Sequence, residues 1–301
     1  MILFLILAAL AGFLFCLSSI YMRKGMYWSG ETFTAVFLAC FTGTLFFGLA
    51  TLGTGKINQL WTLSWYSLLL LSLAGIVHFV VGRLMAWMGA RLIGANLSNP
   101  ILNCQGLVSI FLGIVILEEP FTLSLGIAFV LMIAGIILIS RFGQGEIGGK
   151  KLTRATLGKG IFISILGSIF FGISPMLIKL GLGGSVSATT GGFISYLAAT
   201  VVLCILLFQS GNRNKMRNLN WKTTGLLCLA SVILASAHLL NYMALGGGSV
   251  SLVTPMMSSI ASLVVFPLSF VINRKIEIFN IPVIVGAVLT TAGVYLIFLL
   301  A

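Results

Sequence analysis

The chain has 301 residues, of which 59% are hydrophobic and only 7% are charged, and its mean hydropathy is +1.17. Because a soluble domain carries about 25% charged residues, this composition excludes a soluble protein and indicates a polytopic membrane protein. The net charge of +12 does not indicate nucleic-acid binding, because the basic residues lie between apolar segments, where they report on membrane topology.

Apolar segments long enough to cross a hydrocarbon core of about 30 Å recur along the chain. Their continuous apolar character predicts helices and not the strands of a barrel. The predicted spans are 2–22, 33–52, 64–88, 96–117, 121–141, 159–180, 188–208, 222–245, 250–272 and 279–300. The first lacks a basic n-region and a small-residue cleavage site, so we expect a retained helix. The expected fold class is an all-α polytopic membrane protein with ten transmembrane helices.

The two halves of the chain resemble each other on either side of a Gly-rich basic loop at 142–158. Four pairs of residues share an offset of 155 positions. They are Lys24 and Lys179, Arg83 and His238, Trp87 and Tyr242, and Pro100 and Pro255. Five helices per half is an odd number, so the second half must be inverted in the membrane. We predict two domains, 1–150 and 151–301, each a five-helix repeat, the first including the start of the basic loop.

Basic residues gather in the loops after the odd-numbered spans, such as Arg91, Lys151 and Arg274. Cytoplasmic loops collect Lys and Arg, so both termini are expected outside the cytoplasm of a bacterial inner membrane. The chain has no Asp, only two His and no HExxH or Cys/His cluster. We therefore expect no enzyme activity, no metal and no cofactor.

Two polar stripes interrupt the greasy helices. In the fourth span, Asn96, Asn99 and Asn103 fall at i, i+3 and i+7 on one helix face. The same offset places Ser251, Thr254 and Ser258 in the ninth span. Because polar side chains in lipid must pair or meet water, both stripes are predicted to line a cavity near the midplane. The alternative is that they join helices by hydrogen bonds of about 0.6 kcal/mol each.

Prolines 100 and 255 lie about a turn into these two spans. A proline there frees a carbonyl and can kink the helix, which predicts a hinge at Pro100 and at Pro255. The alternative is a proline tolerated in the first turn of a helix that begins later.

Charged and aromatic residues repeat in the third and eighth spans, where Arg83 precedes Trp87 and His238 precedes Tyr242 by four positions. A cationic or protonatable group beside an aromatic ring could hold a carboxylate or a planar solute. Alternatively, Arg83 snorkels to the interface and His238 is a hydrogen-bonded packing residue. His78 is a further candidate cavity residue, because buried ionisable groups in a membrane are commonly functional.

Lys24 and Lys179 end the first and sixth spans, on opposite sides of the membrane. They are predicted to act as gates or to anchor the helix ends at the interface. Ser18 and Ser174 precede them on the same helices and are predicted to line the cavity.

The chain resembles the drug/metabolite transporter superfamily, and within it the ten-helix proteins with two EamA-type repeats. The resemblance is carried by SSIYMRKG and its echo SPMLIKLG, by WMGARLIGANLSNPI and its echo NYMALGGGSVSLVTPM, and by EEPFTLSLGIAFVLMIAGIILI. It implies a carrier for small organic solutes with an alternating-access cavity, lined by the first, third, fourth, sixth, eighth and ninth spans. The first span lacks the carboxylate on which the superfamily's four-helix drug exporters rely.

From the residues and this resemblance we expect a secondary transporter of small polar or zwitterionic, amino-acid-like metabolites. The alternatives are an exporter of multiple drugs or lipophilic cations and a non-transporting membrane scaffold. The expected partners are a small-molecule solute and the lipid bilayer, with no nucleic acid, and the carrier is expected to function as a monomer.

Overall fold

A computed structural model describes most of the chain as packed helices. The described residues are 2–29, 31–117, 127, 130–131, 133–135, 137–138, 141, 146–147, 150–209, 211–212, 220–273, 281–282, 284–289 and 292. Within this part, 8 helical spans are long and apolar enough to cross a membrane. The predicted spans 121–141 and 279–300 lie largely outside the described residues, although those of their residues that are described are helical. The count of ten helices therefore stays a prediction.

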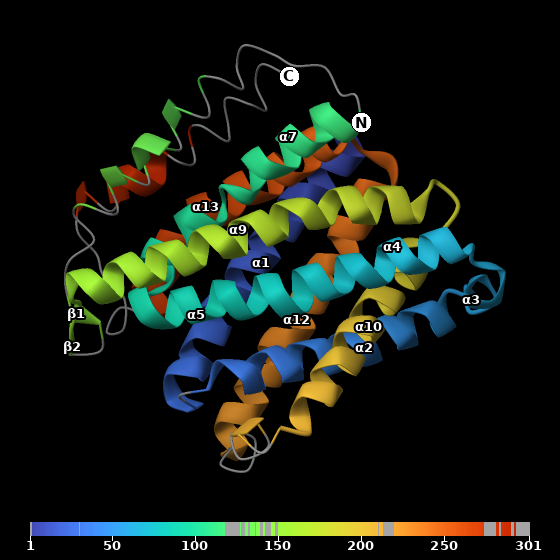
Figure 1. The fold of residues 1–301 in the computed structure, drawn as a ribbon, viewed down its shortest axis with the longest axis horizontal. Helices are drawn as coiled ribbons and strands as arrows, with labels where there is room; N and C mark the ends of the chain where they lie inside the picture. Colours follow the sequence, from blue (N-terminus) through green and yellow to red (C-terminus); the bar gives the residue numbers. More distant parts are fainter. Residues whose placement is uncertain are drawn as a thin grey trace.

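The helices follow the predicted spans in chain order (Figure 1). The first half contains α1 (Ile2–Ser29), α2 (Thr32–Gly53), α3 (Gln59–Thr62), α4 (Trp65–Gly75), the π-helix η1 (Ile76–Gly82), α5 (Arg83–Ile93), α6 (Ala95–Leu102) and α7 (Gln105–Leu117). Two short antiparallel strands, β1 (Glu146–Ile147) and β2 (Lys150–Lys151), lie in the predicted basic loop. The second half contains α9 (Arg154–Leu182), α10 (Ala188–Leu207), α12 (Trp221–Gly247) and α13 (Val250–Ile272).

Two predicted helix ends were wrong in a way that matters for the site. Helix α1 continues past Arg23 and Lys24 to Ser29, because both residues are good helix formers, and Arg23 is buried there. The third span continues through α5 to Ile93, where Gly94 ends it with a φ of 82°. Only glycine adopts that conformation without strain, so Gly94 can separate α5 from α6.

The third and fourth spans are not regular α-helices. The third consists of α4, η1 and α5, and its central turns, from Ile76 to Gly82, are π-helical. Such turns are rare and are frequently found at functional sites. The fourth was predicted as one helix, but a turn at Asn103 and Cys104 divides it into α6 and α7. Pro100 removes one hydrogen bond within α6, because it lacks the N–H that a regular helix would direct to the Asn96 carbonyl.

The first helix of each half packs against the opposite half. Helix α1 packs mainly against α12 and α13, whereas α9 packs against α4, α5, α6 and α7. Figure 1 shows α9 running beside the α4–α5 helix along the long axis of the molecule. Glycines permit the close approach: Gly12 lies on the backbone of Met257 in α13, and Gly167 lies on the backbone of Ala86 in α5.

Helices α2 and α10 cross in a symmetric contact. The ring of Tyr196 lies on Gly43, and the ring of Phe47 lies on Gly192. The two rings stack on each other with centroids 5.3 Å apart. Tyr196 also stacks on Phe79 of η1 at 4.0 Å. Through this stacking, the α2–α10 crossing packs against the π-helical part of the third span.

Candidate substrate-binding cavity

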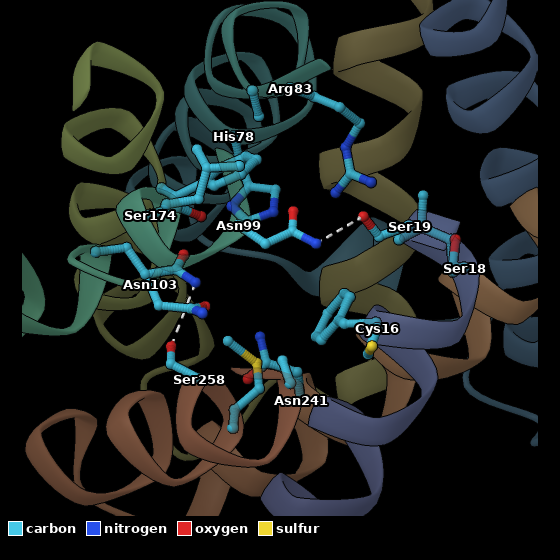
Figure 2. Close-up of a pocket in the computed structure, with 18 of the residues that line it drawn as sticks. Cys16, Ser18, Ser19, His78, Arg83, Asn99, Asn103, Ser174, Asn241 and Ser258 are labelled. Carbon is cyan, nitrogen blue, oxygen red and sulfur yellow. Dashed lines mark hydrogen bonds between the residues drawn. The ribbon is translucent and has the colours of Figure 1, made fainter. Parts of the chain in front are cut away.

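A cavity of about 120 Å³ lies between the two halves of the chain. Its walls come from α1, η1, α5, α6, the start of α7, α9, α12 and α13, which together represent the six spans that the family resemblance implied. Figure 2 shows side chains from these helices converging on one space. The polar lining consists of Ser18, Ser19, His78, Arg83, Asn99, Asn103, Gln105, Ser174, Asn241 and Ser258.

Arg83 is the charged residue of this wall and is almost fully buried, with 4% of its surface exposed. Its Nη2 atom lies 2.8 Å from Nε2 of His238. The guanidinium also lies over the rings of Phe79, Trp87 and Phe171, at 5.3, 5.4 and 6.0 Å. The snorkelling interpretation of Arg83 was wrong, because α5 continues beyond it to Ile93 and the side chain is buried in the bundle.

His238 is buried behind the cavity wall and is not itself a lining residue. An arginine has only hydrogen-bond donors, so the contact with Arg83 requires Nε2 of His238 to be the acceptor. The His238 ring packs edge-on against Phe15 at 4.6 Å, Phe79 at 4.8 Å and His78 at 5.0 Å. Both histidines and Arg83 therefore form one cluster, of which His78 and Arg83 face the cavity.

The asparagine stripe of the fourth span is divided between the cavity and the protein interior. Asn99 and Asn103 line the cavity, and Asn99 Nδ2 donates a long hydrogen bond of 3.5 Å to Ser19 Oγ. Asn96 is fully buried one turn earlier and is not a lining residue. The reason is that α6 packs against α9 at its first turn, where Ser98 and Ser164 share a hydrogen bond of 3.0 Å.

The ninth span contributes only the far end of its predicted stripe. Ser258 lines the cavity, and Gln105 Nε2 donates to its hydroxyl at 3.4 Å. Thr254 is buried away from the cavity, and the half-buried Ser251 does not line it. Both members of the repeat-related pair Asn103 and Ser258 therefore line the cavity.

The remaining predicted cavity residues have different surroundings. Ser18 and Ser174 line the cavity, and the Ser18 hydroxyl donates to the Ala230 carbonyl at 2.8 Å. Trp87 lines the cavity, but its repeat equivalent Tyr242 does not, because it packs in the core against Phe47 at 6.1 Å.

The predicted hinges and gates lie at the ends of the cavity helices. Pro100 is buried within α6, and the Pro255 side chain lies outside the described part of the chain. Lys179 donates from Nζ to the carbonyl of Gly248, which ends α12, at 2.8 Å. Its repeat equivalent Lys24 instead lies over the ring of Trp28 at 5.4 Å.

Sequence reasoning missed several lining residues, among them Ser19, Gln105, Phe171 and Asn241. Asn241 could have been found, since it stands next to the singled-out Tyr242 as a polar residue in an apolar span. Gln105 carried the same signal, but it does not fall on the face of Asn96, Asn99 and Asn103 in a continuous helix, and it reaches the cavity through the break before α7. Among the described residues, no group of His, Cys, Asp and Glu has the arrangement of a metal site.

The sequence matches the model of the EamA-like transporter family twice, over residues 2–141 and 158–299. The chain belongs to this family. A search of curated proteins found no match. Among solved structures, a crystal structure described only as that of a protein superposes with a TM-score of 0.63 at 15% sequence identity. The superposition covers 98% of this chain and 97% of that one, and at this identity it shows the fold alone.

As an EamA-like transporter, the chain is a multi-pass integral membrane protein of the drug/metabolite transporter type. Its two family matches correspond to two EamA-type repeats. The cavity described above lies between these two repeats.

Proposed function

We propose that this EamA-like protein is a secondary carrier that moves small polar or zwitterionic, amino-acid-like metabolites by alternating access. The observation that carries the proposal is the cavity between the two halves, whose polar lining of amides, hydroxyls and one guanidinium comes from both. Polar groups are costly inside a membrane unless they meet water or a polar ligand, so a wall of this kind suits a hydrophilic solute.

Size and charge argue against an exporter of lipophilic cations. The cavity of about 120 Å³ is smaller than the roughly 300–1,000 Å³ of pockets for drug-sized ligands. Its buried charge is the positive one of Arg83, which repels a cation. A non-transporting scaffold would have no use for a polar cavity of this kind, and it predicts no flux.

The two lysines support an alternating mechanism. Lys179 binds the α12–α13 junction at one end of the bundle, whereas Lys24, at the opposite end, lies on Trp28. Because the repeats are inverted, the opposite state of the carrier would have Lys24 bound to the α5–α6 junction and Lys179 released from the α12–α13 junction. The Lys24 end would then be closed and the Lys179 end open. The break at Asn103–Cys104 and Pro100 gives the fourth span a place to bend during this exchange.

The proposal includes the topology expected from the basic loops. It places both termini outside the cytoplasm of a bacterial inner membrane, with the carrier working as a monomer. A reporter fused after Ala301 tests the orientation, since alkaline phosphatase is active only outside the cytoplasm. Activity of a cytoplasmic reporter at that site would refute this topology.

Overexpression followed by untargeted measurement of metabolites in the medium tests the function. We expect one or a few small polar metabolites to accumulate outside cells with the intact chain. Cells with an Arg83→Ala variant or an empty vector should not show this accumulation, and the variant must be present in the membrane at a similar level. Identical metabolite profiles in all three cultures would favour the scaffold.

A further inference from the structure

The cavity holds a buried positive charge whose protein partner is neutral. Arg83 is 4% exposed, and its recorded hydrogen bond goes to a histidine ring. The described side chains include no carboxylate in contact with it, and the sequence contains no Asp at all. The Nε atom of Arg83 is buried with no hydrogen-bond partner among the described residues. A buried charge is stable only when it is paired, which leaves a place for an anion.

His238 can be either the acceptor for Arg83 or a proton carrier, but not both. As the acceptor, it must be neutral with its proton on Nδ1, and that atom has no hydrogen-bond partner among the described residues. If Nε2 were protonated, two donors and two positive charges would face each other across 2.8 Å. The contact with Arg83 therefore disfavours protonation of His238.

We propose that Arg83 and His238 form a joint site for the carboxylate of a net-negative organic acid and one proton. A carboxylate oxygen that enters from the cavity replaces His238 as the acceptor for Arg83, and His238, which is buried behind the cavity wall, is then free to take up the proton. This inference rests on the proposed function and narrows its solute from polar or zwitterionic to anionic. Figure 2 shows the Arg83 side chain extending into the space that Asn99 and Ser174 also face.

Within the described part of the chain, the neighbours of His238 supply no competing negative charge. The titratable groups around it are Arg83 on α5, His78 on η1, Tyr196 on α10 and the thiol of Cys40 on α2, which donates to the Phe79 carbonyl. Helix α1 faces the ring with Phe15, α9 covers Arg83 with Phe171, and α13 contains no titratable residue. The solute is thus the source of the negative charge that would favour a proton on His238.

Proton and anion must then bind cooperatively. The anion removes the hydrogen bond that kept His238 neutral and attracts the incoming proton. By linkage, the proton strengthens anion binding by the same factor. Substrate affinity should therefore rise as the pH falls, by up to about tenfold per pH unit when one proton is taken up.

Four matched probes test this site on the purified full-length protein. Lactate, alanine, lactamide and alaninamide share a three-carbon skeleton and differ in charge. Scintillation-proximity binding of each labelled probe is measured between pH 5.5 and pH 8, where lactate remains ionised. We expect lactate to bind at least tenfold more tightly than the other three, and its affinity to increase toward pH 5.5.

Substitutions separate the two parts of the site. Arg83→Gln should lose lactate binding, whereas His238→Gln should bind lactate more weakly and without pH dependence. Arg91→Gln, an exposed arginine at the end of the same helix, should leave both properties as in the unmodified chain. Each variant is first checked for a monodisperse elution profile.

The outcomes distinguish this inference from the proposed function. Equal or tighter binding of alanine, lactamide or alaninamide would overturn the anion site while leaving a carrier of polar solutes in place. Failure of lactate to bind at any pH would also overturn the anion site. Lactate binding that does not depend on pH would overturn the coupled uptake of a proton by His238. A culture medium unchanged by overexpression would instead count against the proposed function.

Discussion

Arg83 and His238 occupy the same position in the two repeats and contact each other, with Nη2 and Nε2 2.8 Å apart across a separation of 155 residues. A residue that meets its own repeat equivalent lies close to the axis that relates the two halves. Two arginines at this point would face each other with donors only and with two positive charges. The asymmetry of the pair, one donor and one acceptor, makes a stable contact possible at the axis.

Removal of one partner should be worse than removal of both. We expect His238→Phe to lower the stability by about 3 kcal/mol, because the buried guanidinium loses its acceptor. The double variant Arg83→Met, His238→Phe should recover most of this loss, since no unpaired charge remains. The unfolding midpoints of the single and double variants in detergent measure both changes in stability. A double variant as unstable as the sum of the two single variants would show that the pair is not coupled.

The crossing of α2 and α10 depends on its glycines. A methyl group at Gly43 would overlap the ring of Tyr196, so Gly43→Ala should destabilise the protein by about 1–3 kcal/mol. Gly53→Ala, at the exposed end of the same helix, meets nothing within 4 Å and should have little effect. A Tyr196→Leu change made together with Gly43→Ala should restore part of the stability. Equal unfolding midpoints for the two glycine variants would contradict this packing.

Much of the helix order could be predicted, because membrane helices correspond to uninterrupted apolar runs in the sequence. The span at 250–272 was predicted with the bounds that the structure shows. The repeat offset identified Arg83 and His238 as equivalent residues, although it did not predict that they contact each other. Asn99 and Asn103 were predicted as cavity residues because an amide side chain in an apolar membrane helix is costly unless it faces a cavity or the bundle interior.

Other features depend on tertiary contacts that no local pattern encodes. The π-helical turns of η1 fit between Tyr196 and Phe171, and the break before α7 brings Gln105 to the cavity. Asn96 shares a helical face with Asn99, yet packing against α9 removes it from the wall. The α2–α10 crossing relates Gly43 to Gly192 at an offset of 149 (192 − 43), so a comparison at the single offset of 155 did not reveal it.

The two asparagines therefore allow a matched test of cavity against core. Asn99→Leu should lower flux of the exported solute at least tenfold with little change in stability, because its recorded hydrogen bond is long and it faces the cavity. Asn96→Leu should lower stability by about 1–3 kcal/mol, because it replaces a fully buried amide and leaves its surroundings unsatisfied. Flux per folded molecule and unfolding midpoint are measured for both. The reverse pattern would place Asn96, and not Asn99, on the solute path.

Pro100 should matter for movement more than for stability. Pro100→Ala restores an N–H to the helix. The free energy of unfolding should therefore stay the same or rise by up to about 1 kcal/mol. Flux should fall several-fold, since α6 then bends less readily at the break. Pro267→Ala makes the same chemical change at an exposed position of α13 and serves as the control. Unchanged flux in Pro100→Ala would show that the break, and not the proline, provides any bending.

The contact between Lys179 and the Gly248 carbonyl should hold one end of the carrier closed. A hydrogen bond from a charged donor contributes about 1.5–3 kcal/mol, so its loss can shift a two-state equilibrium by tenfold or more. We therefore expect Lys179→Met to expose the α12–α13 junction more often. A reporter cysteine at Ser249, in a chain whose native cysteines are replaced, should react with a membrane-impermeant maleimide about tenfold faster in this variant.

Lys24→Met is the matched control, because it removes the repeat-equivalent lysine from the opposite end of the bundle. Lys24 lies on Trp28 in this state, so its loss should not open the Ser249 end. If Lys24 closes its own end in the other state, its removal should slow labelling at Ser249 by destabilising the state in which that end is open. Faster labelling in both variants would mean that each lysine only anchors its helix, because a gate at one end must act against a gate at the other.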